Sequence, residues 1–216
     1  MAARFSRTGI RKALPVSGEL HLSGPGLTTL VTSLARLANS APIADFAVIG
    51  GLAVLARLEG AHRVTDDLDT VATQHGDEPT VVTAVMNAEG VDGYLDGTKI
   101  DCIAVGDTSA AELHEEQLPD AEEDRVFVLA HRWALDTAEE LVVTAGGGST
   151  SLHVRCQFAS PAGLVAMKRQ CAPRRRAARV HKAGGDYLDI FRLSSHPALT
   201  RPIALSFRTA PHDLGG

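Results

Sequence analysis

The clearest indication of how this chain folds is Phe46-Ala-Val-Ile-Gly-Gly-Leu-Ala-Val-Leu-Ala-Arg-Leu58, followed by Arg63-Val-Thr-Asp-Asp-Leu-Asp69. The apolar run at its start predicts a buried strand over residues 45–49, ending in Gly50-Gly51 and continuing as a helix over residues 52–59. Further on, polar and apolar residues alternate from Asp67 to Val71, which predicts a strand with one solvated face. The stretch is therefore expected to form a strand, a tight turn, a helix and a second strand.

Residue patterns on both sides of this stretch predict further elements. Expected helices cover residues 25–39, 79–89, 161–171 and 186–194, and further expected strands cover residues 98–105, 140–144 and 152–157. Ser160 and Pro161 are the expected N-cap and first residue of the third of these helices. The glycine-rich segment 146–150 lacks the Lys-Ser/Thr ending of a phosphate-binding P-loop, so we interpret it as a hairpin turn. No internal repeat or low-complexity tract interrupts the pattern.

These elements predict an α/β (α+β) protein with a mixed β-sheet flanked by helices and a C-terminal helical part. The expected organisation is an irregular lead-in over residues 1–24, a core over residues 25–158, and a helical region with a tail over residues 159–216. A length of 216 residues suits a single core. Widely spaced Cys102, Cys156 and Cys171 predict buried free thiols rather than a disulfide framework or a zinc cluster.

The composition also bounds the location and the partners of the protein. The chain is 44% hydrophobic and 22% charged, and its apolar runs are shorter than the roughly 20 residues that cross a bilayer. Together with the absence of a signal-peptide pattern, this predicts a cytoplasmic protein without a membrane partner. The formal net charge of −5 argues against a protein that coats nucleic acid by charge alone.

The charge is nevertheless unevenly distributed along the sequence. Residues 112–124 are strongly acidic. A short basic segment follows near the C-terminus and contains Lys168, Arg169, Arg174, Arg175, Arg176, Arg179 and Lys182. The basic segment is typical of a surface that faces a polyanion, and its alternative interpretation is a solvated helical surface.

Carboxylates supply the first candidate chemistry. Asp67 and Asp69 are two positions apart on an expected strand, so both side chains project from the same face. Their mutual repulsion favours a bound cation, and magnesium prefers carboxylate oxygens together with substrate phosphates. Asp101 adds a third carboxylate if its strand lies beside the first. The alternative for an isolated Asp-x-Asp pair is a turn cap or an exposed strand face.

The diglycine adds a candidate anion site. A strand, a glycine turn and a helix N-terminus direct backbone N–H groups and the positive end of the helix dipole at a bound phosphate. Glycine lets the backbone approach the ligand closely. Gly50-Gly51 taken alone is equally compatible with a tight turn that binds nothing.

Together these residues resemble the AbiEii/AbiGii-type toxin nucleotidyltransferases of the polymerase-β-like superfamily. Gly50-Gly51, a helix and Arg63-Val-Thr-Asp-Asp-Leu-Asp69 match the first block of that family, and Lys99-Ile-Asp-Cys-Ile103 matches its third acidic strand. The second block is matched by Pro161, Leu164, Lys168, Arg174 to Arg176, Asp186 and Asp189. The resemblance covers about residues 45–193 and implies a nucleotidyltransferase core.

The resemblance also implies roles for individual residues. The metal ligands would be Asp67, Asp69 and Asp101. The catalytic residues would be these three together with Lys168. The residues that bind the nucleotide would be Gly50, Gly51, Arg63, Thr65, Lys168 and Asp186.

Alternatives stay open for several of these residues. Lys168 could be a helix-surface lysine, and Arg63 could form a structural ion pair instead of contacting a phosphate. Asp186 is expected close to the nucleotide, where it would orient Lys168. Asp189 is expected to do no more than fix helix packing. Asp66 points to the opposite strand face and is expected to be dispensable.

The activity that the resemblance implies is transfer of a nucleotidyl group from a nucleoside triphosphate (NTP) to an acceptor hydroxyl, with magnesium, or alternatively manganese, as cofactor. It implies RNA as the acceptor, particularly the tRNA 3′ end, and a cognate antitoxin protein as a partner. Two alternatives keep the site but use a small molecule of the aminoglycoside type, or a protein side chain, as acceptor. A third alternative is a catalytically silent nucleotide-binding or interaction module.

Overall fold

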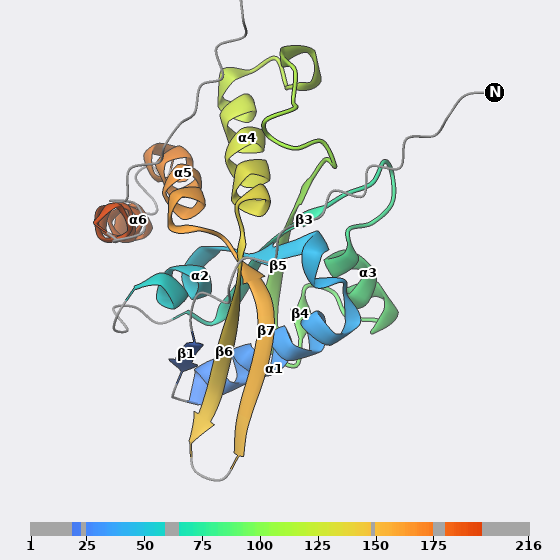
Figure 1. Ribbon diagram of the computed structural model, residues 1–216, viewed down its shortest axis with the longest axis vertical. Helices are drawn as coiled ribbons and strands as arrows, with labels where there is room; N and C mark the ends of the chain where they lie inside the picture. Colours follow the sequence, from blue (N-terminus) through green and yellow to red (C-terminus); the bar gives the residue numbers. More distant parts are fainter. Residues whose placement is uncertain (1–18, 23–24, 59–64, 148–149, 175–179, 196–216) are drawn as a thin grey trace, which may run out of the picture.

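The computed structural model describes residues 19–22, 25–58, 65–147, 150–174 and 180–195. Its strands form one mixed sheet in the order β1-β6-β7-β2-β3-β5-β4, and helices cover both faces of this sheet (Figure 1). The predicted mixed α/β architecture, a sheet flanked by helices, is therefore confirmed.

The strands are β1 (Glu19–Leu22), β2 (Phe46–Val48), β3 (Asp67–Thr73), β4 (Tyr94–Leu95), β5 (Thr98–Val105), β6 (Glu139–Gly147) and β7 (Thr150–Phe158). The α-helices are α1 (Pro25–Ser40), α2 (Gly50–Arg57), α3 (Val81–Ala88), α4 (Glu122–Asp136), α5 (Pro161–Cys171) and α6 (Val180–Ser194). Short 3-10 segments are η1 (Ile43–Asp45), η2 (Glu115–Gln117) and η3 (Ala172–Arg174). Strand pairs β1–β6, β2–β7 and β3–β5 are parallel, and β2–β3, β4–β5 and β6–β7 are antiparallel.

Helix α1 covers one face of the sheet. Leu30, Leu34 and Leu37 recur on one side of this helix and are buried in the core, as their spacing predicts. The hydroxyl oxygen of Ser33 lies 2.8 Å from the Leu95 carbonyl oxygen and 2.8 Å from Oγ1 of Thr98. The even-numbered side of β5 therefore faces α1, and its odd-numbered residues face the other side of the sheet.

Helices α2, α4 and α5 cover that other side, with α6 packed on α5 (Figure 1). The guanidinium of Arg57 at the end of α2 donates to the carbonyl oxygens of Phe158 at 3.0 Å and Ala159 at 3.1 Å, and it pairs with Glu139 at 2.7 Å. Burial lowers the pKa of Arg57, and the Glu139 carboxylate opposes that effect. These contacts tie α2 to the β7–α5 connection.

Helix α4 begins inside the acidic stretch and was not predicted from the sequence. It carries the buried Arg132, whose guanidinium donates to the Gly106 carbonyl at 2.8 Å and pairs with Asp136 one turn later. The other oxygen of Asp136 accepts from the Ala110 backbone N–H at 2.7 Å. This buried network fixes α4 to the segment that follows β5, because breaking it would strand charged groups away from water.

Helix α5 begins as its sequence predicts. The Ser160 hydroxyl accepts from the Gly163 backbone N–H at 3.1 Å, which satisfies one of the free N–H groups at the helix N-terminus. A Cβ on Gly163 would lie 2.9 Å from the Cα of Ala134, so glycine permits close packing of α5 on α4.

Several expectations are corrected by the structure. The expected irregular lead-in contains β1, helix α2 begins at Gly50 rather than at residue 52, and α6 begins six residues before Asp186. Among the cysteines only Cys156 is fully buried, which raises its thiol pKa to about 12, whereas the other two are half-buried. The hairpin expectation for residues 146–150 agrees with the β6–β7 pairing, although residues 148–149 lie outside the described residues.

None of the helices in the described parts of the chain combines the length and the apolar character needed to span a bilayer. The expected tail after α6 falls on residues 196–216, which lie outside the described residues, as do residues 175–179 of the basic segment.

Candidate metal and nucleotide site

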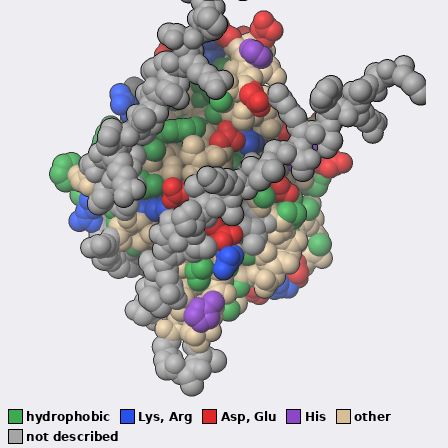
Figure 2. Space-filling model, viewed as in Figure 1, with side chains coloured by type: hydrophobic (Ala, Val, Ile, Leu, Met, Phe, Trp, Pro, Cys, Tyr) green, Lys and Arg blue, Asp and Glu red, His purple; other side chains and the backbone are tan. Residues whose placement is uncertain are grey.

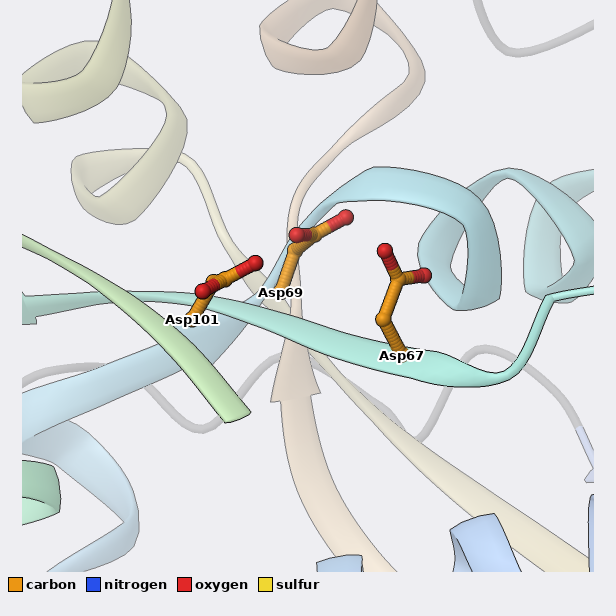
Figure 3. Close-up of side chains that lie close together, drawn as sticks. All are labelled: Asp67, Asp69 and Asp101. Carbon is orange, nitrogen blue, oxygen red and sulfur yellow. The ribbon is translucent and has the colours of Figure 1, made fainter. Parts of the chain in front are cut away.

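Three carboxylates gather where β3 and β5 run side by side. The parallel register places Asp69 opposite Asp101, and Asp67 lies two residues before Asp69 on the same face. One oxygen from each of the three carboxylates lies within 4.8 Å of the others. The close-up shows all three side chains rising from one side of the two strands, below the start of α2 (Figure 3).

The carboxylates differ in exposure and therefore in chemistry. Asp69 is largely withdrawn from solvent, and its pKa is raised by burial first and then by the neighbouring charges of Asp67 and Asp101. The positive charges of Lys182 and Lys168 oppose this effect. Asp101 is exposed, with 48% of its side chain accessible. A carboxylate that is both buried and surrounded by like charge carries an unfavourable energy that a bound cation would relieve.

The Thr65 side chain positions the carboxylate of Asp67. Its hydroxyl donates to Oδ1 of Asp67 at 3.0 Å, and Thr65 itself is buried. The structure thus places the hydroxyl of Thr65, an expected nucleotide-binding residue, against an expected metal ligand. Asp66 is exposed, whereas Arg63 lies outside the described residues.

The glycine turn lies directly against Asp69. Gly50 adopts φ of +65°, in the left-handed region, whereas Gly51 is not among the glycines with positive φ. A Cβ on Gly50 would lie 1.8 Å from Oδ2 of Asp69 and 2.6 Å from its Cγ. The Ile49 backbone N–H also donates to the Asp69 carbonyl at 2.9 Å. Gly50 is therefore required both by backbone conformation and by the space that the Asp69 carboxylate occupies.

Gly50→Ala is expected to destabilise the fold or displace the Asp69 side chain, because the new methyl group and the carboxylate cannot occupy the same space. Gly90→Ala is the matched control: Gly90 has φ of +66°, and a Cβ there would meet nothing within 4 Å. It should lose only the roughly 1–2 kcal/mol of the left-handed conformation. Urea unfolding of both variants measures the difference, and equal losses would contradict the assigned close approach.

Lys168 enters the site from α5. Its Nζ lies 2.9 Å from Oδ1 of Asp186 and 2.8 Å from Oδ2 of Asp189, both on α6, and all three residues are buried. A helix-surface lysine is therefore excluded. Asp189, which is expected to fix helix packing, pairs with the ammonium as closely as Asp186 does and so joins α6 to α5.

A cavity of about 140 Å³ is lined by both Lys168 and one of the three carboxylates, Asp69. Its polar lining comes from Gly50, Asp69, His131, Lys168, Cys171 and Asp186, and four apolar side chains complete it. The cavity therefore borders the glycine turn and the lysine, which are expected to hold a triphosphate, and Asp69, which is an expected metal ligand.

Two groups at this site were not singled out from the sequence. The Nδ1 atom of His131 lies 2.7 Å from the Phe127 carbonyl oxygen, so Nδ1 carries the proton and Nε2 is the acceptor of the neutral ring. Burial lowers the pKa of His131 and favours that neutral form. Lys182, an exposed residue of α6, acts electrostatically on Asp69. From the sequence, Lys182 is expected only as one member of the basic segment.

The donor set fits a small divalent cation. Carboxylate oxygens are the ligands that magnesium and manganese prefer, and magnesium sites typically complete their coordination with water and substrate phosphates. All three candidate ligands in this cluster of described residues are aspartates. Zinc sites in proteins typically include histidine or cysteine, so this set of ligands does not resemble a zinc site.

Comparison with known proteins finds no matching family model, no matching curated protein and no matching solved structure.

Proposed function

We propose that this protein is a metal-dependent nucleotidyltransferase that transfers a nucleotidyl group from an NTP to an acceptor hydroxyl. The single observation that carries the proposal is the convergence of Asp67, Asp69 and Asp101 beside the Gly50 turn, with their oxygens within 4.8 Å of one another. Folding such a group of like charges is unfavourable unless a cation offsets it. The three carboxylates would hold magnesium or manganese.

The protein groups around the cavity supply the binding of the triphosphate. The turn at Gly50 brings the N-terminus of α2 to Asp69, where free backbone N–H groups favour phosphate oxygens. Lys168 provides a positive charge in the lining of the same cavity. Asp186 and Asp189 hold that ammonium in one position, so it does not have to be ordered when the nucleotide binds.

The acceptor is expected to reach the site at Asp101. This carboxylate is the exposed member of the three, so it can accept a proton from an incoming hydroxyl as the new phosphoester bond forms. The bond between the α-phosphorus and the oxygen that bridges the α- and β-phosphates then breaks, and pyrophosphate leaves. A bound divalent cation would lower the pKa of the hydroxyl and neutralise charge on the phosphates.

RNA, in particular the tRNA 3′ end, is the proposed acceptor, and an antitoxin is the proposed protein partner, both from the family resemblance. Lys182 lies close enough to act on Asp69, so the described end of the basic segment borders the site. Over the described part of the face in Figure 2, acidic and basic side chains are interspersed. This favours local capture of an RNA end over coating of a long polyanion.

The test uses purified protein, each of the four α-labelled NTPs, magnesium, and separate reactions with total tRNA, an aminoglycoside panel and a protein acceptor. Transfer of label to RNA, lost on chelation of the metal, is the expected result. Transfer to an aminoglycoside or to protein would overturn the proposed acceptor but keep the reaction class. Calorimetric NTP binding without transfer to any acceptor would support the silent nucleotide-binding module instead.

A further inference from the structure

Lys99 is a fourth charged residue on the face that carries the three carboxylates. The parallel register places Lys99 opposite Asp67, just as Asp101 lies opposite Asp69. Residues 99 and 101 are two apart on β5, so both side chains project from the same face. The four side chains therefore form a compact group across two neighbouring strands, with three negative charges and one positive charge.

The Lys99 ammonium is directed at this group. Its Nζ forms a salt bridge and a hydrogen bond with Oδ2 of Asp101. The hydrogen bond to Asp101 is the main cause of a raised Lys99 pKa, and the Asp101, Asp67 and Tyr94 charges add to it. The positive charge of Lys99 thus acts on two of the three carboxylates that would hold a metal.

The other lysines near the site are placed differently. Lys168 is buried and pairs with Asp186 and Asp189 at 2.9 and 2.8 Å, and among the described residues no hydrogen bond or ion pair joins it to the three carboxylates. Lys182 acts on Asp69 only through its charge, and no hydrogen bond or ion pair joins them among the described residues. Lys99 is thus the lysine in direct contact with an expected metal ligand.

We propose that Lys99 is a built-in counter-cation, which partly neutralises the carboxylates in the metal-free protein and is displaced from Asp101 when a divalent cation binds. This inference rests on the proposed function, because it assigns the carboxylates to a metal. Both partners of the bridge have 48% exposed side chains. A salt bridge that is this exposed is weakly held, so a divalent cation can displace the ammonium into solvent.

Displacement has a consequence for metal affinity. The ammonium occupies one carboxylate oxygen and repels an incoming cation, so it lowers the affinity of the empty site for a metal alone. A metal ion that is already bound to a triphosphate brings the negative charge of the phosphates with it. The displaced ammonium does not repel this complex. Lys99 thereby makes the site select the metal–nucleotide complex over the free metal ion.

The test is a titration of Mn²⁺ alone into the metal-free full-length protein. Binding is measured by calorimetry and by the decrease in the electron paramagnetic resonance signal of free Mn²⁺. Lys99→Ala is expected to bind Mn²⁺ about tenfold more tightly than the unaltered protein, because one positive charge is removed within a few ångströms of the ion. Lys99→Arg keeps the charge and should bind like the unaltered protein.

Arg155→Ala is the matched control. Arg155 is an exposed cation paired with Glu140 at 3.0 Å on a neighbouring strand, away from the three carboxylates. Its removal should leave Mn²⁺ affinity unchanged. A thermal melt with and without Mn²⁺ identifies a variant that fails to fold, in which case Lys99→Met, which keeps the length of the side chain, replaces Lys99→Ala.

The possible outcomes separate this inference from the proposed function. Tight Mn²⁺ binding that is lost in Asp69→Asn but is unchanged or weakened in Lys99→Ala would overturn the counter-cation role and leave the metal site standing. Absence of Mn²⁺ binding in both the unaltered protein and Lys99→Ala would overturn the metal site and the counter-cation role together.

Discussion

Asp69→Asn should strongly slow nucleotidyl transfer and at the same time make the metal-free protein more stable. The substitution removes a partly buried charge that lies beside two like charges, and it keeps the size of the side chain. Loss of a metal ligand at the reacting centre should reduce kcat by roughly 10³-fold, the upper end of what removal of one electrostatic group costs. Relief of the buried charge should add about 0.5–2 kcal/mol to the free energy of unfolding without metal.

The stability gain should depend on pH in a defined direction. Because burial and like charges raise the Asp69 pKa above its ordinary value of 3.8, the carboxylate opposes folding once it ionises. Below that value the carboxyl is protonated in both states, and the variant gains nothing. The gain should appear as pH rises through the folded-state pKa and persist above it. Urea unfolding in EDTA from pH 4 to pH 8 measures this.

Asp66→Asn is the matched control for both effects. Asp66 is exposed, lies just before β3 and is not one of the three clustered carboxylates. The same chemical change there should alter neither transfer nor stability by more than about 0.5 kcal/mol. Transfer at an undiminished rate in Asp69→Asn would refute the site assignment, and an unchanged unfolding curve for that variant would refute the electrostatic account of the cluster.

Lys168→Met is the second substitution for which a large effect is expected. The methionine keeps most of the aliphatic length but removes the charge that faces two buried carboxylates, Asp186 and Asp189. Removal of one partner from a buried ion pair typically costs 3–5 kcal/mol. We therefore expect a loss of about 3–5 kcal/mol in urea unfolding, together with loss of triphosphate binding measured by calorimetry.

Removing the two facing charges together with the ammonium separates structure from function at this position. The triple variant with Lys168→Met, Asp186→Asn and Asp189→Asn carries no net charge in this group and should recover most of the lost stability. Nucleotide binding should not return, because the ammonium is still absent. Recovery of both stability and binding would show that Lys168 has only a structural role.

Much of the candidate site could be predicted because its residues are close in sequence. The Gly50 turn follows directly from an apolar run, and the Asp67 and Asp69 spacing fixes a common strand face in any fold that keeps the strand. Asp101 required one further assumption, that its strand lies beside the first, which the β3–β5 pairing meets. The position of Lys168 came from the resemblance, and its burial is a result of the structure.

The remaining contributions depend on tertiary contacts that no local pattern records. The pairing of Asp189 with Lys168 depends on how α6 packs on α5. The position of Lys99 opposite Asp67 depends on the β3–β5 register. Helix α4, with His131, was missed for another reason. Its first turn is acidic, which is a normal helix N-terminal signal, but this turn continues a longer acidic stretch and was interpreted as part of it.

The one-to-one alignment of β3 with β5 has a consequence for how the chain can change over time. Deletion of a single residue between Thr98 and Asp101 would rotate Asp101 toward α1, among the buried leucines of the opposite face. The exposed segment 75–79, which precedes α3, contributes no group to the site. Gains and losses of length should therefore accumulate in that connection between homologous chains, while the two strands keep a constant number of residues.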